Sequence, residues 1–377
     1  MSDLTKIWHY NRPQLAEKLV TRGQALERIA LFGPRQTGKT SLLREEIMPL
    51  AEQKGMLAIY IECWADRADP LGSINYALQK ALDRLAVPAA GIGRTLKTKV
   101  KKIGIASASL ELGEEPARPM PTSKFLKVDA LLTTILNETK QDVLLVFDEF
   151  QALASEAGAD QSSAALRSTL TQASKRVGAI FSGSSEILLL ETFSRTKAPL
   201  YGFANPEAYP LLDEKFVAHV IHKFKLATGR ELAIGEAMHV FDRLGRQPEP
   251  FMNAVSNAMA NSRWGLERGL RAMLDPTLKN KWTINWFGLT DVQRVALRLI
   301  FESRQATSRE SLDWAATQLG QAKVQASTIS RAIETLVERG LVERRQLDGG
   351  KGYRVGDPVM AAWLSENRLA LTGKATG

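Results

Sequence analysis

One loop constrains the fold of this chain more than any other feature of its sequence: Gly33-Pro34-Arg35-Gln36-Thr37-Gly38-Lys39-Thr40. The loop has the spacing Gly-x-x-x-x-Gly-Lys-Thr, an apolar run at residues 28–32 precedes it, and a helix-like segment follows from Ser41. Glycines at these positions let the backbone curl, so that successive N–H groups and the next helix N-terminus point toward phosphate oxygens. The motif therefore predicts a strand, a phosphate-binding loop and a helix, in that order.

The residues of the loop have separate predicted tasks. Lys39 would reach the β- and γ-phosphates of a nucleotide, and the hydroxyl of Thr40 would ligate Mg²⁺. The predicted nucleotide contacts are Gly33, Pro34, Arg35, Gln36, Thr37, Gly38, Lys39, Thr40 and Ser41. The sequence has no Asn-Lys-x-Asp guanine motif, the nearest candidate being Asn280-Lys281-Trp282-Thr283. ATP with Mg²⁺ is therefore favoured over GTP, by elimination.

A second nucleotide motif lies downstream, where the apolar run 143–147 ends in Asp148 and Glu149, the form of a Walker B segment. Asp148 would hold Mg²⁺ through water, and Glu149 would polarise the attacking water. In-line displacement at a phosphate needs both a neutralising metal and an oriented nucleophile. The predicted metal ligands are thus Thr40 and Asp148, and the predicted reaction is ATP hydrolysis.

Two further positions have a functional and a structural interpretation. Ser184, in Ser182-Gly183-Ser184-Ser185, could sense the γ-phosphate and align the attacking water, or it could cap the helix that follows. Arg195 could complete the site of a neighbouring subunit in a homo-oligomer, or it could be an ordinary surface residue. The sequence leaves both pairs of interpretations open.

Between about residues 25 and 212, apolar runs alternate with helix-period segments, as in a parallel sheet with crossover helices. The predicted strands are residues 28–32, 56–63, 142–147, 177–182 and, more weakly, 209–212. Residues 1–212 are thus expected to form an α/β domain of the P-loop NTPase type. Prolines and glycines interrupt it at residues 88–127. The basic run 94–102 inside this insertion serves either solubility or contact with a phosphate backbone.

From Asp213 onward the pattern becomes helical. Asp213 can cap a helix and Gly229 can end it, which predicts a small helical lid over residues 213–284. Residues 285–377 then show helical periods near 289–304, 308–319 and 326–339, followed by two β-like runs around a turn at 348–352. Three helices and a hairpin predict an α+β winged-helix domain.

The third helix of this domain has an apolar face, comprising Ile329, Ile333, Leu336 and Val337. Its polar residues are then free to meet a groove of double-stranded DNA. The predicted DNA contacts are Ser327, Thr328, Ser330 and Arg331 on the helix, and Arg344, Arg345 and Lys351 on the wing. Acidic residues lie beside them at Glu334, Glu338, Glu343 and Asp348, so the patch is only modestly basic. A surface that contacts protein is the alternative.

Composition excludes several other classes of protein. The chain has 50 Lys plus Arg against 41 Asp plus Glu, with 44% hydrophobic residues, which is typical of a globular protein rather than a disordered or fibrous one. Its one cysteine, Cys63, cannot form an intramolecular disulfide, and no apolar stretch approaches the roughly 20 residues that cross a bilayer. A cytoplasmic protein without membrane contact is expected.

Together, these residues resemble the archaeal-ATPase-like branch of the STAND and AAA+ P-loop ATPases, in which an ATPase core and a helical lid precede a winged helix. The likeness rests on residues 33–43, Phe147-Asp148-Glu149-Phe150-Gln151, Gly183-Ser184-Ser185, Pro199-Leu200-Tyr201-Gly202, Gly245-Arg246-Gln247-Pro248 and residues 352–358. The resemblance implies that Arg12 and Pro248 frame the adenine. Many relatives have arginine where this chain has Phe203, and Arg195 or Arg246 is the candidate substitute.

The sequence therefore predicts an ATP-binding and ATP-hydrolysing molecular switch of AAA+/STAND type, whose winged helix contacts DNA. The alternative is an ATP-binding signalling or scaffold module, with slow hydrolysis, whose winged helix contacts a protein partner.

Overall fold

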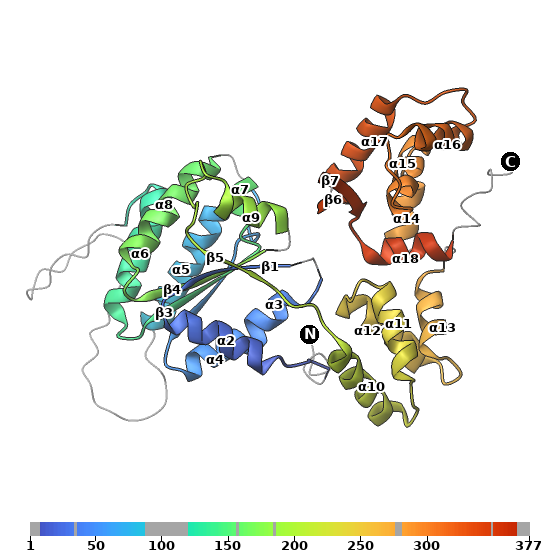
Figure 1. Cartoon of the computed structure of the whole chain (residues 1–377). Helices are drawn as coiled ribbons and strands as arrows, with labels where there is room; N and C mark the ends of the chain where they lie inside the picture. The colour runs from blue at the N-terminus through green and yellow to red at the C-terminus, as the bar shows by residue number, and fades with distance from the viewer. Residues whose placement is uncertain are drawn as a thin grey trace, which may run out of the picture. The chain divides into compact units, whose positions relative to one another are not determined.

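The computed structural model of the chain describes residues 8–33, 36–86, 120–155, 158–183, 186–275, 281–347 and 350–367. The chain divides into two compact units (Figure 1). One, here called the sheet unit, comprises Asn11–Pro210. The other, the helical unit, comprises Leu211–Gly377 together with Met1–Tyr10. Each unit has its own apolar core, so each is described by itself.

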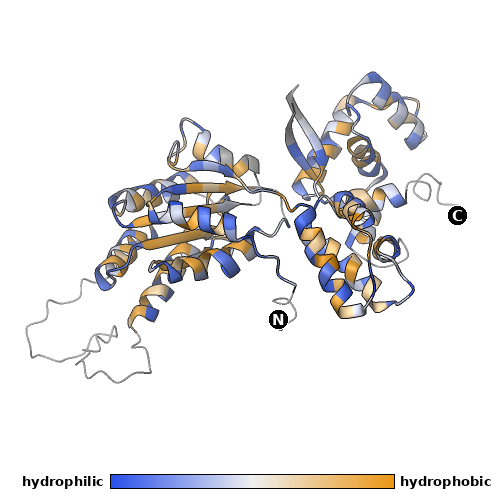
Figure 2. Ribbon diagram, turned by 60° about the horizontal axis from the view of Figure 1, so that its bottom comes forward, coloured by the Kyte–Doolittle hydropathy of each residue, from blue (hydrophilic) through white to orange (hydrophobic). Residues whose placement is uncertain are grey.

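The sheet unit is built on five parallel strands in the order β2-β3-β4-β1-β5. They are β1 (Arg28–Phe32), β2 (Leu57–Glu62), β3 (Val143–Asp148), β4 (Val177–Gly183) and β5 (Asn205–Ala208). Every residue of β3 and β4 is buried, which explains why these strands are continuous apolar runs in the sequence (Figure 2). The parallel sheet and the α/β class expected from the sequence are confirmed.

The predicted position of the fifth strand was wrong. The strand is Asn205–Ala208, and it pairs with β1 at the edge of the sheet, where most of its side chains are exposed. An exposed edge strand needs no apolar run, so β5 has no hydrophobic signal. The residues that the prediction chose, 209–212, follow the strand; Tyr209 and Leu212 are buried in the apolar cores, whereas Leu211 is exposed.

Helices cover both faces of the sheet (Figure 1). On one face lie α2 (Pro13–Gln24), α3 (Lys39–Leu42), the π-helical turn η1 (Leu43–Ile47) and α4 (Met48–Gln53). On the other lie α5 (Pro70–Ala86), α6 (Lys124–Glu138), α7 (Ala152–Ser155), α8 (Ala159–Gln172) and α9 (Glu186–Ser194). The expected irregular insertion, 88–127, falls mostly outside the described residues, including its basic run 94–102. Its last four residues, 124–127, are helical, because α6 begins at Lys124 with Ser123 as its N-cap.

The helical unit begins with four helices: α10 (Glu214–Thr228), α11 (Ile234–Arg243), α12 (Pro248–Ala260) and α13 (Leu266–Met273). The Asp213 side chain accepts a hydrogen bond from the backbone N–H of Lys215, and Gly229 ends α10 with a φ of 70°, so both predicted caps are present. Next come α14 (Lys281–Phe287), α15 (Asp291–Phe301), α16 (Arg309–Leu319) and α17 (Ala326–Glu338). The antiparallel pair β6 (Val342–Leu347) and β7 (Gly350–Val355) and then α18 (Pro358–Glu366) complete the winged helix.

One apolar core runs through the whole helical unit, from Leu212 to Leu364. Polar contacts link its two ends as well: Arg243 on α11 bonds to Glu267 on α13 at 2.7 Å and to Glu366 on α18. The side-chain amide of Asn367 donates to the carbonyl of Leu274 at 3.3 Å. The first four helices of the unit and the winged helix are therefore packed as one body.

A pair of glycine substitutions tests the packing of this body. A Cβ at Gly269 on α13 would collide with the carbonyl oxygen of Ala254 on α12, whereas one at Gly235 on α11 would meet nothing within 4 Å. Gly269→Ala is expected to lower the free energy of unfolding by about 1–3 kcal/mol, the usual cost of overpacking. Gly235→Ala should raise it by about 0.4–1 kcal/mol through chain entropy. Denaturant titration followed by circular dichroism measures both, and equal effects would contradict the packing described.

Candidate nucleotide-binding site

The phosphate loop lies between β1 and α3, as its sequence requires. Gly38 forms the N-cap of α3 with a φ of 92°, a left-handed conformation that glycine adopts without strain. Gly33 leaves little room for a side chain, because a Cβ there would lie 3.0 Å from the Cβ of Tyr209. Pro34 and Arg35 lie outside the described residues; Gln36, Thr37 and Ser41 continue the loop into the helix.

Lys39 is held inside the loop, where its side chain is only 5% exposed. Its Nζ donates to the carbonyl oxygen of Gly33 at 2.8 Å. Tyr209, a residue that sequence reasoning missed, closes one side: its hydroxyl donates to the Thr37 carbonyl at 3.3 Å, and burial raises its pKa to about 12. The phenol therefore stays protonated, and its hydrogen bond persists at any physiological pH.

Arg12, an expected adenine contact, packs against the same tyrosine. Its guanidinium carbon lies 4.6 Å from the centre of the Tyr209 ring, within the range of a cation–π interaction, and its Nη1 donates to the Pro210 carbonyl at 2.8 Å. Pro248, the other expected adenine contact, is the first residue of α12 in the helical unit. Its contact with adenine stays a prediction.

The two predicted magnesium ligands meet. Thr40 Oγ1 donates to Asp148 Oδ2 at 2.7 Å, and Asp148, at the end of β3, is 2% exposed. A hydroxyl and a carboxylate are hard oxygen donors of the kind that Mg²⁺ prefers, so the residues present fit this ion. Within the described ranges, no group of three His, Cys, Asp or Glu residues could hold a metal. This is compatible with Mg²⁺, which is usually bound by one or two carboxylates together with substrate phosphates.

Two side chains on β2 join this site that the sequence analysis did not identify. Tyr60 donates from its hydroxyl to Asp148 Oδ2 at 2.8 Å, and Glu62 pairs in register with Asp148. Burial and the charge of Asp148 raise the pKa of the Glu62 carboxyl, although Arg44 lies 3.5 Å from it. The signal was the alternation Tyr60-Ile61-Glu62, which puts both polar side chains on one face of a strand end. It became informative only once β2 was known to neighbour β3.

Glu149 follows Asp148 in an uncommon backbone conformation, with a φ of 52°. Its N–H donates to Asp148 Oδ1 at 3.1 Å, and its carboxylate accepts a hydrogen bond from the side-chain amide of Gln151.

Ser184 lies outside the described residues. Its neighbour Ser182 is fully buried, and its hydroxyl has no hydrogen-bond partner among the described residues. Arg195 follows α9, is exposed, and lies 3.8 Å from Asp160.

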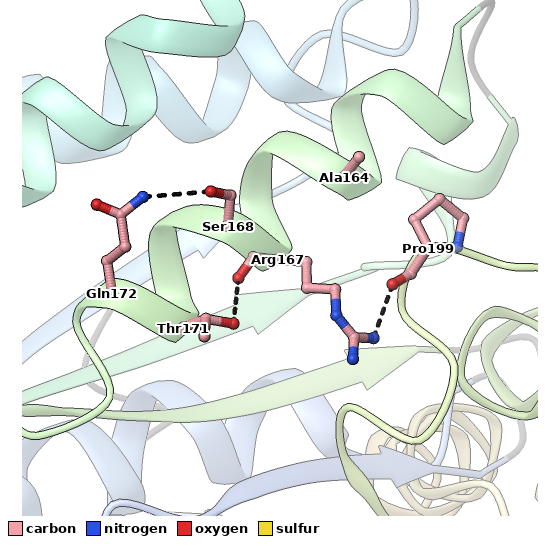
Figure 3. A pocket seen from close by; sticks show the side chains of 6 residues that line it. All are labelled: Ala164, Arg167, Ser168, Thr171, Gln172 and Pro199. Carbon is pink, nitrogen blue, oxygen red and sulfur yellow. Dashed lines mark hydrogen bonds between the residues drawn. The ribbon is translucent and has the colours of Figure 1, made fainter.

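Phe203, the departure from the family pattern, packs against two arginines. The guanidinium carbons of Arg28 and Arg167 lie 4.1 and 5.1 Å from the centre of its ring. Arg167 also donates to the carbonyl of Pro199 at 2.8 Å (Figure 3). A second bond, to the carbonyl of Tyr201 at 3.0 Å, helps to hold the segment before Phe203 against α8. A shallow cavity of about 460 Å³ beside Arg167 is lined by residues of α8 and by Pro199.

The predicted DNA-contacting face of α17 is open to solvent. Its exposed residues are Ser327, Thr328, Ser330 and Arg331, while Ile329, Ile333 and Leu336 are buried. The wing differs, because two of its arginines are paired with carboxylates. Arg344 bonds to Glu334, which also accepts from Tyr353 at 3.3 Å, and Arg354 bonds to Glu343 at 2.8 Å. The side chains of Arg345 and Lys351 lie outside the described residues.

The fold and the loop define an α/β architecture of the P-loop NTPase-like type with a C-terminal winged helix. The structure of a Walker-type ATPase from Pyrococcus abyssi is similar over 95% of this chain and 99% of that chain, with a TM-score of 0.57 and 16% identity. The ADP form of the ORC2 protein of Aeropyrum pernix is similar over 98% of each chain, with a TM-score of 0.53 and 13% identity. The resemblance to winged-helix P-loop ATPases expected from the motifs is therefore confirmed at the level of the fold.

No protein-family model matches the sequence, and no curated protein is similar to it. Among the helices that the structure describes, none is both long and apolar enough to cross a membrane.

Neutralising Glu62 tests the electrostatics of the site. Because the fold raises the pKa of Glu62, the ionised carboxylate is less favourable in the folded chain than in the unfolded one. The resulting loss of stability grows as the pH rises and the carboxyl group ionises. Glu62→Gln is expected to raise the free energy of unfolding at pH 7 without metal by about 0.5 kcal/mol, a value typical of solvent-screened charges. At pH 4 the gain should shrink.

Glu45→Gln is the matched control, since Glu45 is exposed on the same helical turn as Arg44. It should leave stability unchanged at both pH values. Thermal unfolding in chelator measures the series, and a loss of stability in Glu62→Gln at pH 7 would contradict the assignment.

Proposed function

We propose that this chain is an ATP-binding and ATP-hydrolysing switch of the AAA+/STAND type, acting in the cytoplasm, with a winged helix that contacts double-stranded DNA. The observation that carries the proposal is the 2.7 Å hydrogen bond between Thr40 and Asp148, beside the buried ammonium of Lys39. These residues lie far apart in the sequence and come from two different motifs. Their convergence supports one site for nucleotide and metal.

Each candidate site residue of the sheet unit has its own role in the proposed reaction. Lys39, which bonds to the Gly33 carbonyl, would bind the β- and γ-phosphate oxygens instead. Thr40 would hold Mg²⁺ directly and Asp148 would hold it through water. When bound, Mg²⁺ neutralises charge on the phosphates. Glu149 orients the water that attacks the γ-phosphate. Ser184 would sense that phosphate, and Arg195 would complete the site of a neighbouring copy in a homo-oligomer.

Residues 1–212 would be the ATPase core, 213–284 the lid and 285–377 the winged helix. Arg12 and Pro248 would frame the adenine, so that the lid responds to the bound nucleotide. ATP drives such a response only insofar as it binds one conformation better than the other. Because the lid and the winged helix share one core, a displacement of the lid would carry the winged helix with it.

A second candidate, an ATP-binding signalling or scaffold module whose winged helix holds a protein, is favoured by one observation. The wing arginines Arg344 and Arg354 are paired with Glu334 and Glu343, which reduces the positive charge that a phosphate backbone would meet. DNA binding would then depend on the exposed face of α17.

Two substitutions separate nucleotide binding from turnover. Lys39→Ala is expected to abolish binding of MgATP, because it removes the buried cation that faces the phosphates. Glu149→Gln should keep binding and lower turnover by about 10²–10⁴-fold, the usual contribution of a positioned acid or base. Calorimetry measures the first effect and phosphate release the second. Normal turnover in Glu149→Gln would remove this residue from the mechanism.

The DNA contact is tested by duplex binding against salt. Each phosphate contact that is lost should reduce the slope of log K against log salt by about 1, so Arg331→Ala is expected to weaken binding and flatten the slope. Arg263→Ala is the control, since Arg263 is an exposed arginine of the lid. If the wild-type chain binds no duplex at low salt, with or without ATP, the protein-binding candidate is favoured.

A further inference from the structure

Gln151 is an uncharged but strongly polar side chain in a place where water cannot reach it. It lies two residues after Glu149 and is 2% exposed. A buried amide is costly unless its hydrogen bonds are made inside the protein. Its Nε2 donates to Oε2 of Glu149, so the donor is used on the carboxylate to which the proposed function gives the attacking water.

The other end of the same amide lies against the tip of β4. A Cβ at Gly183 would lie 2.5 Å from Gln151 Oε1, so glycine is the residue that leaves room for the amide. The backbone between them is fixed as well, because the N–H of Phe150 donates to the carbonyl of Ser182 at 2.8 Å. The amide of Gln151 is therefore confined between Glu149 and the residue that precedes Ser184.

The backbone of Glu149 brings the two side chains together. Its left-handed φ of 52° costs about 1–2 kcal/mol for a residue with a Cβ. Such a conformation persists where the surroundings determine it, here through the bond from the Glu149 N–H to Asp148 and the anchoring of Phe150. The strained turn lies between the metal ligand and Gln151.

We propose that Gln151 is a positioning residue for Glu149: its amide fixes the direction of the Glu149 carboxylate and ties that direction to the tip of β4. This inference rests on the proposed function, because it assumes that Glu149 orients water. A glutamate side chain has several rotatable bonds, and restraining it in advance removes an entropic cost from the reacting arrangement. In this role Gln151 acts only through Glu149 and contacts neither the nucleotide nor the attacking water.

Gln151→Leu removes the amide at similar size. It is expected to lower kcat for ATP by about tenfold to hundredfold, the cost of a misplaced reacting group, with the KM and the MgATP dissociation constant unchanged. In a Glu149→Gln background the same substitution should change kcat by less than twofold, because the carboxylate that it positions is already absent. Additive losses would instead indicate a purely structural role and overturn the proposal.

Asn75→Leu is the matched control. Asn75 is another buried amide of the sheet unit, and it donates to the Lys124 carbonyl at 3.0 Å. Its loss should reduce stability and leave kcat unchanged. If Gln151→Leu does not fold, Gly183→Ala provides the second variant, because the added methyl group displaces the Gln151 amide, and it should show the same loss of kcat.

The outcomes distinguish this inference from the function on which it rests. A wild-type chain without turnover, or with turnover that Glu149→Gln leaves intact, contradicts the proposed hydrolytic role and the inference with it. A wild-type chain whose turnover depends on Glu149 but not on Gln151 overturns the inference alone.

Discussion

A single carboxylate oxygen, Oδ2 of Asp148, holds the candidate nucleotide site together. It accepts hydrogen bonds from Thr40 at 2.7 Å and from Tyr60 at 2.8 Å, and so connects the phosphate-loop helix, β2 and β3. Parallel strands make this possible, because their carboxyl ends lie at one edge of the sheet, where ligands of open α/β proteins bind. Asp148 itself is buried, whereas Thr40 is exposed and Tyr60 is half-buried, so the two bonds join the interior of the sheet to its surface.

The sequence was sufficient wherever a local pattern carries the geometry. The glycine spacing places Lys39 and Thr40 at a helix N-terminus, and a buried strand followed by two acids places Asp148. The apolar spacing on α17 correctly separated Ile329 and Ile333 from Arg331. In each case the information lies within one element and its flanking turn.

Other features depend on which elements become neighbours, and no local pattern contains that information. Tyr60 and Glu62 matter because β2 lies beside β3, and Gln151 matters because Glu149 adopts a left-handed turn. Strand β5 was misplaced because an exposed edge has no apolar run. The pairing of Arg344 with Glu334 joins a wing strand to a helix, so counting charges along the sequence could not reveal it.

The continuous core of the helical unit also determines where the chain can be cut. A truncation near residue 285, which sequence boundaries would suggest, leaves the apolar surfaces of Leu270 and Leu274 on one fragment and those of Trp363 and Leu364 on the other. Exposed surfaces of this kind favour aggregation. The first four helices of the helical unit and its winged helix should therefore be expressed together, and they should melt in a single cooperative transition.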